Sequence, residues 1–226
     1  MLLLLHGALG SAAQLNPLAT ELSPTFTQIH TFDFEGHGGK NFSGQPFTIA
    51  GFAQATVQYI TEHATKPVNI FGYSMGGYVA LYIARHFPQW VNKVCTLATK
   101  FAWDPQTAAK EAAMLNPQKI KEKVPAFAAQ LQQRHQPNDW ELLLHQTANM
   151  MLQLGNKPQL TDDDFSHIAC PVKIGVGDQD NMVTLEETIS AYRKLPNAQL
   201  MVLPDTRHPF ERISYPRLAY ELANFF

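Results

Sequence analysis

The sequence predicts an α/β fold with a mostly parallel sheet of about six strands, helices on both faces and an inserted block of helices. Short apolar runs alternate with longer amphipathic runs along most of the 226 residues, as in parallel strands joined by helices. The alternation stops from 101 to 168, where Ala, Gln, Met and Leu recur at helical spacing. We therefore expect one core built from 1–100 and 169–226, with 101–168 as a helical insertion.

Six short apolar runs predict the strands. The first follows Met1 directly and is followed at once by His6 and Gly7, so it is too short for the apolar part of a signal peptide and predicts a buried strand. Apolar runs of this length are typical of strands buried on both faces. The expected strands are 2–5, 28–34, 68–73, 91–98, 172–176 and 199–203.

Amphipathic segments between these runs predict the helices of the core. Pro88 and Pro196 stand just beyond two of them, where a helix commonly stops. In the insertion, Asp104 before Pro105 predicts a helix start, and Asn138 with Glu141 resembles a capping box that opens another helix. The expected core helices lie near 11–22, 48–63, 75–87, 185–195 and 215–226.

The charge balance limits the partners. Lys and Arg number 17 and Asp and Glu number 19, the formal net charge is -2, and no block of like charges occurs. This disfavours nucleic acid and anionic membranes. No apolar run reaches the length of a membrane span. We expect a small-molecule substrate and water as the partners, and a cytoplasmic location.

The sequence offers no pattern for a metal or a cofactor. Cys95 and Cys170 stand far apart in apolar surroundings, which favours two reduced core thiols. The scattered histidines lack the pairing of a metal site, and no nucleotide-binding fingerprint follows a strand. We expect neither a metal nor a cofactor.

The strongest local signal is the run from Gly72 to Gly77, which lies where an expected strand ends and an expected helix begins. A sharp turn there would strain the backbone of Ser74 and expose its hydroxyl at the carboxyl edge of the sheet. Glycines at 72 and 76 remove side chains that would clash in such a turn. The alternative interpretation is a glycine-rich turn with a surface serine.

A serine nucleophile needs a base and a group that orients the base. Asp178 and Asp180 follow one expected strand, and His208 follows the next. The chain order is thus serine, acid, histidine, with His208 as general base and acid. Taken separately, Asp180 could cap a helix and His208 could be a solvated loop residue.

The loop after the first strand, which begins His6-Gly7-Ala8-Leu9, is suited to an oxyanion hole. Ala8 in this loop and Met75 after the serine would each direct a backbone N–H at the oxygen of a tetrahedral intermediate. The alternative is a tight turn without this role.

Together these landmarks resemble the α/β-hydrolase superfamily over nearly the whole chain. They occur in the family's order: His6-Gly7-Ala8, the run from Asp33 to Gly38, Ser74 in its turn, the run from Gly177 to Asp180, and His208. The resemblance selects Asp180 as the triad acid and implies that 101–168 is a helical cap. It also implies that His37 is a structural loop residue.

One feature departs from the family pattern. Members usually have two antiparallel strands before the strand that precedes His-Gly, and this chain begins on that strand itself. Either the sheet is trimmed to about six strands with 28–34 at an edge, or the chain start is not the natural one. An uncovered edge can pair with another chain, so both a monomer and a homodimer are compatible with the sequence.

The expected activity is a serine hydrolase that cleaves a carboxylic ester or related acyl bond through an acyl-enzyme on Ser74. The apolar bias of the insertion predicts a small, partly apolar substrate, with candidate contacts at Leu9, Trp103, Met114, Trp140 and Met150. A lyase or carbon-carbon bond hydrolase is the alternative on the same triad, although such metabolite lyases often carry Arg where this chain has Tyr78. A ligand-binding receptor on this fold is the alternative from another class.

Overall fold

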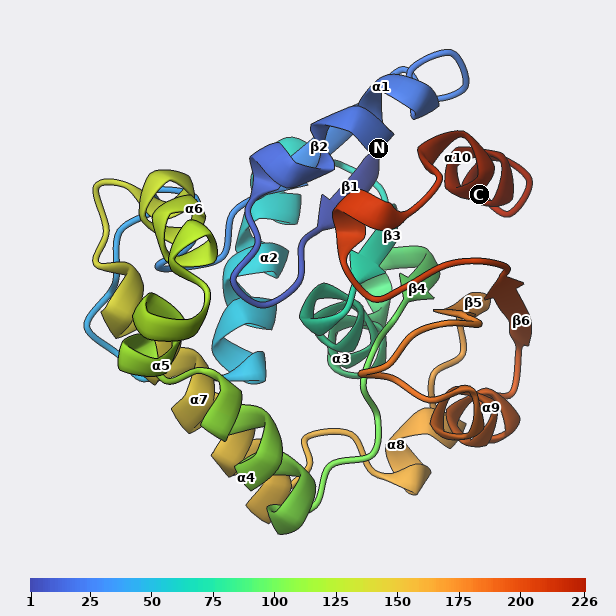
Figure 1. The fold of residues 1–226 in the computed structure, drawn as a ribbon. Helices are drawn as coiled ribbons and strands as arrows, with labels where there is room; N and C mark the ends of the chain where they lie inside the picture. The colour runs from blue at the N-terminus through green and yellow to red at the C-terminus, as the bar shows by residue number, and fades with distance from the viewer.

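The computed structural model describes residues 1–226, which form a sheet of six parallel strands in the order β2-β1-β3-β4-β5-β6 (Figure 1). The expected fold class is confirmed. β1 lies between two parallel neighbours, since Leu3 pairs with His30 of β2 and with Ile70 of β3. The strands are β1 (Leu2–Leu5), β2 (Ile29–Phe32), β3 (Val68–Tyr73), β4 (Val91–Leu97), β5 (Val172–Gly177) and β6 (Ala198–Leu203).

Helices cover both faces of the sheet. α1 (Asn16–Leu22) and α10 (Tyr215–Ala223) pack on one face, and α2 (Ile49–His63), α3 (Met75–His86) and α9 (Leu185–Lys194) lie on the other. Three short 3-10 turns complete the core elements: η1 (Ala12–Leu15), η2 (Pro88–Trp90) and η3 (Phe210–Arg212).

β1 illustrates why a central strand can be wholly apolar. Leu2 and Leu4 point into the cluster formed with α1 and α10, whereas Leu3 and Leu5 point into the cluster formed with α2 and α3. Successive side chains of a strand face opposite sides of the sheet, and here both sides are covered. All four leucines are therefore buried.

Five helices and no strand lie between β4 and β5. Figure 1 shows α4 to α7 grouped on the side of the core away from α10, with α8 beside α9. α4 packs along α7, where Gly155 leaves room for the backbone of Asp104 and the side chain of Ala108. These helices are α4 (Pro105–Met114), α5 (Pro117–Lys123), α6 (Pro125–His135), α7 (Trp140–Asn156) and α8 (Asp162–Ser166).

The start of α7 differs from the predicted capping box. Asp139, not Asn138, caps the helix, because its carboxylate accepts hydrogen bonds from the N–H groups of Glu141 and Leu142. The amide of Asn138 instead donates to the carbonyls of Lys40, at 2.8 Å, and Gly36, at 3.3 Å. Asn138 thus attaches the helical segment to a loop of the core.

None of the helices combines the length and the apolar character that crossing a bilayer requires.

The two-sided burial of β1 gives a stability prediction. We expect Leu4→Ala to lower the free energy of unfolding by about 2 to 5 kcal/mol, because Leu4 is fully buried and the truncation leaves a cavity. Urea denaturation followed by circular dichroism measures the change. Leu200→Ala on β6 is the control, since Leu200 is 37% exposed and its truncation should change the same free energy by less than about 0.5 kcal/mol. Equal losses in the two variants would contradict this packing.

Candidate active site

Ser74 occupies a strained turn between β3 and α3. Its backbone φ is 51° and ψ is -117°, a conformation that residues other than glycine rarely adopt. Its N–H donates to the carbonyl of Leu97 at 2.8 Å, and its carbonyl accepts from the Thr99 hydroxyl at 3.0 Å. The turn also needs Gly76, where an added Cβ would lie 2.5 Å from the Leu5 carbonyl oxygen. β1, β3 and β4 therefore all hold the turn that carries the serine.

Asp180 and His208 form a direct pair at the ends of β5 and β6. The distance from Nδ1 of His208 to Oδ2 of Asp180 is 2.8 Å, and the Asp180 side chain is only 1% exposed. The other carboxylate oxygen of Asp180 accepts from the N–H groups of Met182 and Val183. Burial opposes the negative charge, but the hydrogen bond from His208, its charge and these two N–H groups together lower the pKa of Asp180.

Asp178 has a different contact. Its carboxylate accepts a 3.1 Å hydrogen bond from the N–H of Thr206 and so ties the loop after β5 to the loop after β6. Of the two aspartates considered from the sequence, Asp180 is the one hydrogen-bonded to His208. Thr184, and not Asp180, caps α9. The backbone N–H groups that donate to Asp180 belong to Met182 and Val183, in the turn before this helix.

Tyr73 connects the serine turn to the loop of the histidine. Its hydroxyl donates a hydrogen bond to the backbone carbonyl of His208, and its ring packs against His208 and Phe210. Burial raises the pKa of Tyr73, so the phenol stays protonated and remains a donor. The residue before Ser74 therefore positions the backbone of His208.

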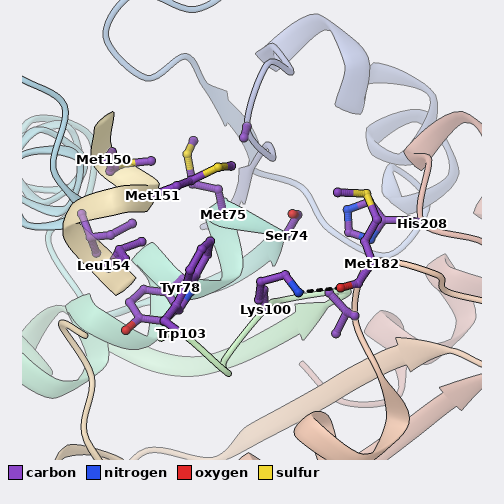
Figure 2. Close-up of a pocket in the computed structure, with 13 residues that line it drawn as sticks. Ser74, Met75, Tyr78, Lys100, Trp103, Met150, Met151, Leu154, Met182 and His208 are labelled. Carbon is purple, nitrogen blue, oxygen red and sulfur yellow. Dashed lines mark hydrogen bonds between the residues drawn. The ribbon is translucent and has the colours of Figure 1, made fainter. Parts of the chain in front are cut away.

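Ser74 and His208 border one cavity of about 60 Å³, which Figure 2 shows between the end of β3 and α7. No hydrogen bond joins the two side chains directly. Of the 13 lining residues, ten are hydrophobic, so the cavity favours an apolar group beside the serine. The lining comprises Ala8, Ile49, Ser74, Met75, Tyr78, Lys100, Trp103, Met150, Met151, Leu154, Met182, Val183 and His208.

The structure brings some of the predicted substrate contacts to this cavity and not others. Trp103 and Met150 line it, as do both residues of the expected oxyanion hole, Ala8 and Met75. Three predicted contacts do not line it. Met114 is 49% exposed near the end of α4, Trp140 is buried in the core, and Leu9 is buried with its carbonyl turned toward α6.

Seven lining residues are not among the predicted substrate contacts and come from separate parts of the chain: Ile49, Tyr78, Lys100, Met151, Leu154, Met182 and Val183. Two of these had a visible signal. Met182 and Val183 immediately follow the acid loop, whose position after a strand places it at the edge of the sheet. Lys100 follows the end of β4 at the same edge, and the other four become neighbours of Ser74 through the packing of α2, α3 and the helical segment.

Lys100 is the one lysine or arginine of the lining. Its ammonium donates to the carbonyl of Met182 at 2.7 Å, shown by the dashed line in Figure 2, and lies 3.3 Å from the Glu111 carboxylate. The carboxylate of Glu111 therefore balances the charge of Lys100.

Two further lining residues, Trp103 and Tyr78, carry polar groups. The indole N–H of Trp103 is buried without a hydrogen-bond partner. Burial raises the pKa of Tyr78 to about 12, and its hydroxyl accepts from the N–H of Leu160.

The loop after β1 curves around a buried histidine. The N–H of Gly10 donates to the carbonyl of Gly7, and Leu9 between them adopts a positive φ of 59°. The His6 ring bonds to the Gly7 carbonyl through Nδ1 and accepts the Phe34 N–H through Nε2. This brings Ala8 to the mouth of the cavity that Ser74 borders.

No group of three or more His, Cys, Asp or Glu side chains is arranged to hold a metal ion. Both cysteines are free; Cys95 is buried, and Cys170 is partly buried with its pKa raised by burial to about 11. Neither thiol lines the cavity.

Residues 1–211 match the model of a hydrolase family described as serine aminopeptidase, S33. The chain belongs to this family, and its fold is that of the α/β-hydrolase superfamily. The structure of E-2-(acetamidomethylene)succinate hydrolase superposes with a TM-score of 0.81 at 18% identity, covering 100% of this chain and 90% of that one. A thermophilic esterase from Thermogutta terrifontis gives a TM-score of 0.76 at 21% identity, covering 99% and 88%. The fold assignment is therefore secure over the full length.

Among curated relatives, a pimeloyl-[acyl-carrier protein] methyl ester esterase of Neisseria meningitidis serogroup C is 34% identical over 96 residues. The match covers 42% of this chain and 35% of that esterase. A protein of Wickerhamomyces anomalus named "Probable alcohol acetyltransferase" is 34% identical over 95 residues, covering 40% of this chain and 27% of that protein. The matched part thus spans about a third of the length of these relatives.

Three buried histidines beside the loop after β1 give a pH prediction. Burial lowers the pKa of His6 to about 3, that of His135 to about 4, and that of His37 well below its usual value. Below about pH 6.5 the unfolded chain therefore binds more protons than the folded chain does, and the free energy of unfolding falls as the pH falls. Each histidine contributes at most about 1.4 kcal/mol per pH unit.

Urea unfolding measured between pH 7 and pH 5 tests this, because that window lies above the usual range of carboxylates. The slope should diminish in His6→Gln and persist in His145→Gln, whose side chain is exposed on α7. A wild-type stability that stays flat across this window would contradict the prediction.

Proposed function

We propose that the protein is a serine hydrolase that cleaves a carboxylic ester or related acyl bond, with Ser74 as nucleophile, His208 as general base and acid, and Asp180 as its orienting partner. The observation that carries the proposal is the 2.8 Å pair of Asp180 and His208, whose histidine borders the same cavity as the strained Ser74. An activated serine of this kind requires these three roles. The family match and the esterase among the relatives support ester hydrolysis.

In the proposed reaction, Nε2 of His208 accepts the Ser74 proton as Oγ attacks the substrate carbonyl carbon. Asp180 holds the other ring nitrogen, Nδ1, in its protonated form and stabilises the imidazolium. The backbone N–H groups of Ala8 and Met75 receive the oxygen that becomes negative. His208 then protonates the leaving alcohol, and a water molecule attacks the acyl-enzyme by the same steps.

We assign the helical segment 101–168 the role of a cap over the serine. Trp103, Met150, Met151 and Leu154 of this segment line the cavity, so they would contact whatever group is bound beside Ser74. The volume of about 60 Å³ is small beside the several hundred Å³ of drug-sized sites. The proposed substrate therefore carries a short, apolar acyl or alkyl group. The apolar lining favours ester hydrolysis over lyase chemistry on small polar metabolites.

The first prediction from this proposal concerns the nucleophile. We expect a fluorophosphonate probe to label the wild-type protein once, on Ser74, and to label neither Ser74→Ala nor His208→Ala. Turnover of a short p-nitrophenyl ester should fall by roughly a million-fold in Ser74→Ala, as in other serine-triad enzymes. Intact-mass spectrometry and peptide mapping locate the adduct.

Ser190→Ala is a control for the labelling experiment, because Ser190 is exposed on α9, outside the cavity and away from the loop after β1. It should be labelled as fast as the wild type. Retention of a tenth of the turnover in a folded Ser74→Ala protein, or an adduct on another residue, would refute the assignment.

The second prediction concerns acyl chain length. Met151→Ala enlarges the cavity, so we expect the ratio of kcat/KM for octanoyl over acetyl esters to rise about tenfold. Leu152→Ala is the matched control on the same helix, since Leu152 is 40% exposed and lies outside the lining. If both variants leave the ratio at its wild-type value, the cavity beside Ser74 does not hold the acyl group.

A further inference from the structure

The last two residues of α6, Arg134 and His135, both contact the backbone carbonyl of Leu9. Nη1 of Arg134 donates to this oxygen at 2.8 Å, and Nε2 of His135 lies 3.1 Å from it. Leu9 directly follows Ala8, the residue that borders the cavity and carries one of the proposed oxyanion N–H groups. Two side chains from the helical segment thus converge on one peptide of the loop after β1.

The hydrogen bonds of His135 fix its tautomer. Nδ1 of its ring accepts the N–H of Gly38 at 3.1 Å, so this nitrogen carries no proton. The proton is then on Nε2, which donates to Leu9. His135 is fully buried, and burial lowers its pKa, so this neutral form persists at physiological pH. The ring therefore joins the loop after β1 to the loop after β2 as a neutral donor and acceptor.

Leu9 needs such support because of its backbone conformation. A positive φ of 59° is unfavourable for leucine, because its Cβ atom crowds the backbone in this region, whereas glycine has no Cβ atom. On the other side, the N–H of Gly10 donates to the Gly7 carbonyl and closes the turn. Arg134 and His135 of α6 both donate to the Leu9 carbonyl that this turn leaves facing α6. They therefore fix the orientation of the peptide groups around Ala8.

Arg134 also reaches the far side of the site. Its Nη2 lies 3.4 Å from the carboxylate of Glu211, which accepts from the Gln14 amide at 2.6 Å. Glu211 stands in η3, three residues after His208. One guanidinium therefore contacts the loop of the proposed oxyanion hole and the turn that follows the proposed base.

We propose that Arg134 and His135 are positioning residues that hold the Ala8 N–H in place for the oxygen of the tetrahedral intermediate. The oxyanion hole then depends on the end of α6 being docked on the loop after β1. This inference rests on the proposed function for its catalytic consequence. Its structural part, the rigid loop from residue 6 to 12, can be measured without turnover.

Asn138 offers a matched control for this proposal. It attaches the same end of the helical segment to the core through the carbonyls of Lys40 and Gly36, and its side chain makes no hydrogen bond to Leu9. A variant that only loosens the helical segment should resemble Asn138→Ala. A variant that releases the oxyanion loop should differ from it.

The test compares four variants. His135→Asn keeps an acceptor for Gly38 but is too short to donate to Leu9, whereas His135→Gln extends its amide toward the Leu9 carbonyl. Arg134→Met removes the other donor and keeps the apolar part of the side chain. With a short p-nitrophenyl ester, we expect kcat to fall about ten- to a hundredfold in His135→Asn and Arg134→Met, with KM changed by less than about threefold. His135→Gln should recover most of the loss.

Asn138→Ala should keep the wild-type kcat even where its melting temperature falls as far as that of His135→Asn. Affinity for an arylboronic acid, which forms a tetrahedral adduct with an activated serine, should fall in parallel with kcat. If kcat follows the melting temperature across all four variants, the two residues only stabilise the fold and the proposal is wrong.

Hydrogen-deuterium exchange of segment 6–12 separates this proposal from the proposed function. Exchange in this segment should accelerate in His135→Asn and Arg134→Met and stay at the wild-type rate in Asn138→Ala. An unchanged rate in the first two variants would overturn the proposal even if the enzyme is an active esterase. If exchange accelerates in these two variants but fluorophosphonate does not label the wild-type protein, Arg134 and His135 still hold the loop after β1, and the proposed function is wrong.

Discussion

The site depends on the left-handed backbone of Ser74, which the surrounding sheet holds in place. Such a conformation persists only where neighbours determine it, and here the neighbours are the Leu97 carbonyl, the Thr99 hydroxyl and the backbone of Leu5 pressed against Gly76. β1 and the end of β4, on either side of β3, supply these contacts. The close contacts at Gly76 leave no room for a Cβ atom, so a side chain at this position would force the turn that carries the serine to shift.

The remaining groups reach the serine because parallel strands end at one edge of the sheet. β1 delivers the loop with Ala8, β5 delivers Asp180, and β6 delivers His208. Tyr73 couples two of these ends through its bond to the His208 carbonyl, and Asp178 couples the loops after β5 and β6. In the proposed mechanism, the sheet is thus the rigid support that keeps acid, base and nucleophile at fixed separations.

Features that depend on local sequence could be predicted, and those that depend on packing could not. The six strands and the positions of Ser74, His208 and the two candidate aspartates follow from apolar runs and from the residues after them, and the family resemblance selects Asp180 over Asp178. Met114 and Trp140 carry apolar side chains at helical spacing, but only the packing of α4 and α7 decides that one faces solvent and the other the core. The hydrogen bonds by which Asn138 attaches the helical segment to the core could not be predicted either, because its partners Gly36 and Lys40 lie far away in the sequence.

The most direct test of the proposed mechanism is to trap the covalent intermediate. A short ester is mixed with the wild-type protein, the reaction is stopped with acid on the millisecond scale, and the peptide that contains Ser74 is weighed by mass spectrometry. The proposed mechanism predicts that this peptide gains the mass of one acyl group within the first turnover and loses it as the substrate is exhausted. Hydrolysis that proceeds with no acylated peptide at any time, or with the acyl group on another residue, would contradict it.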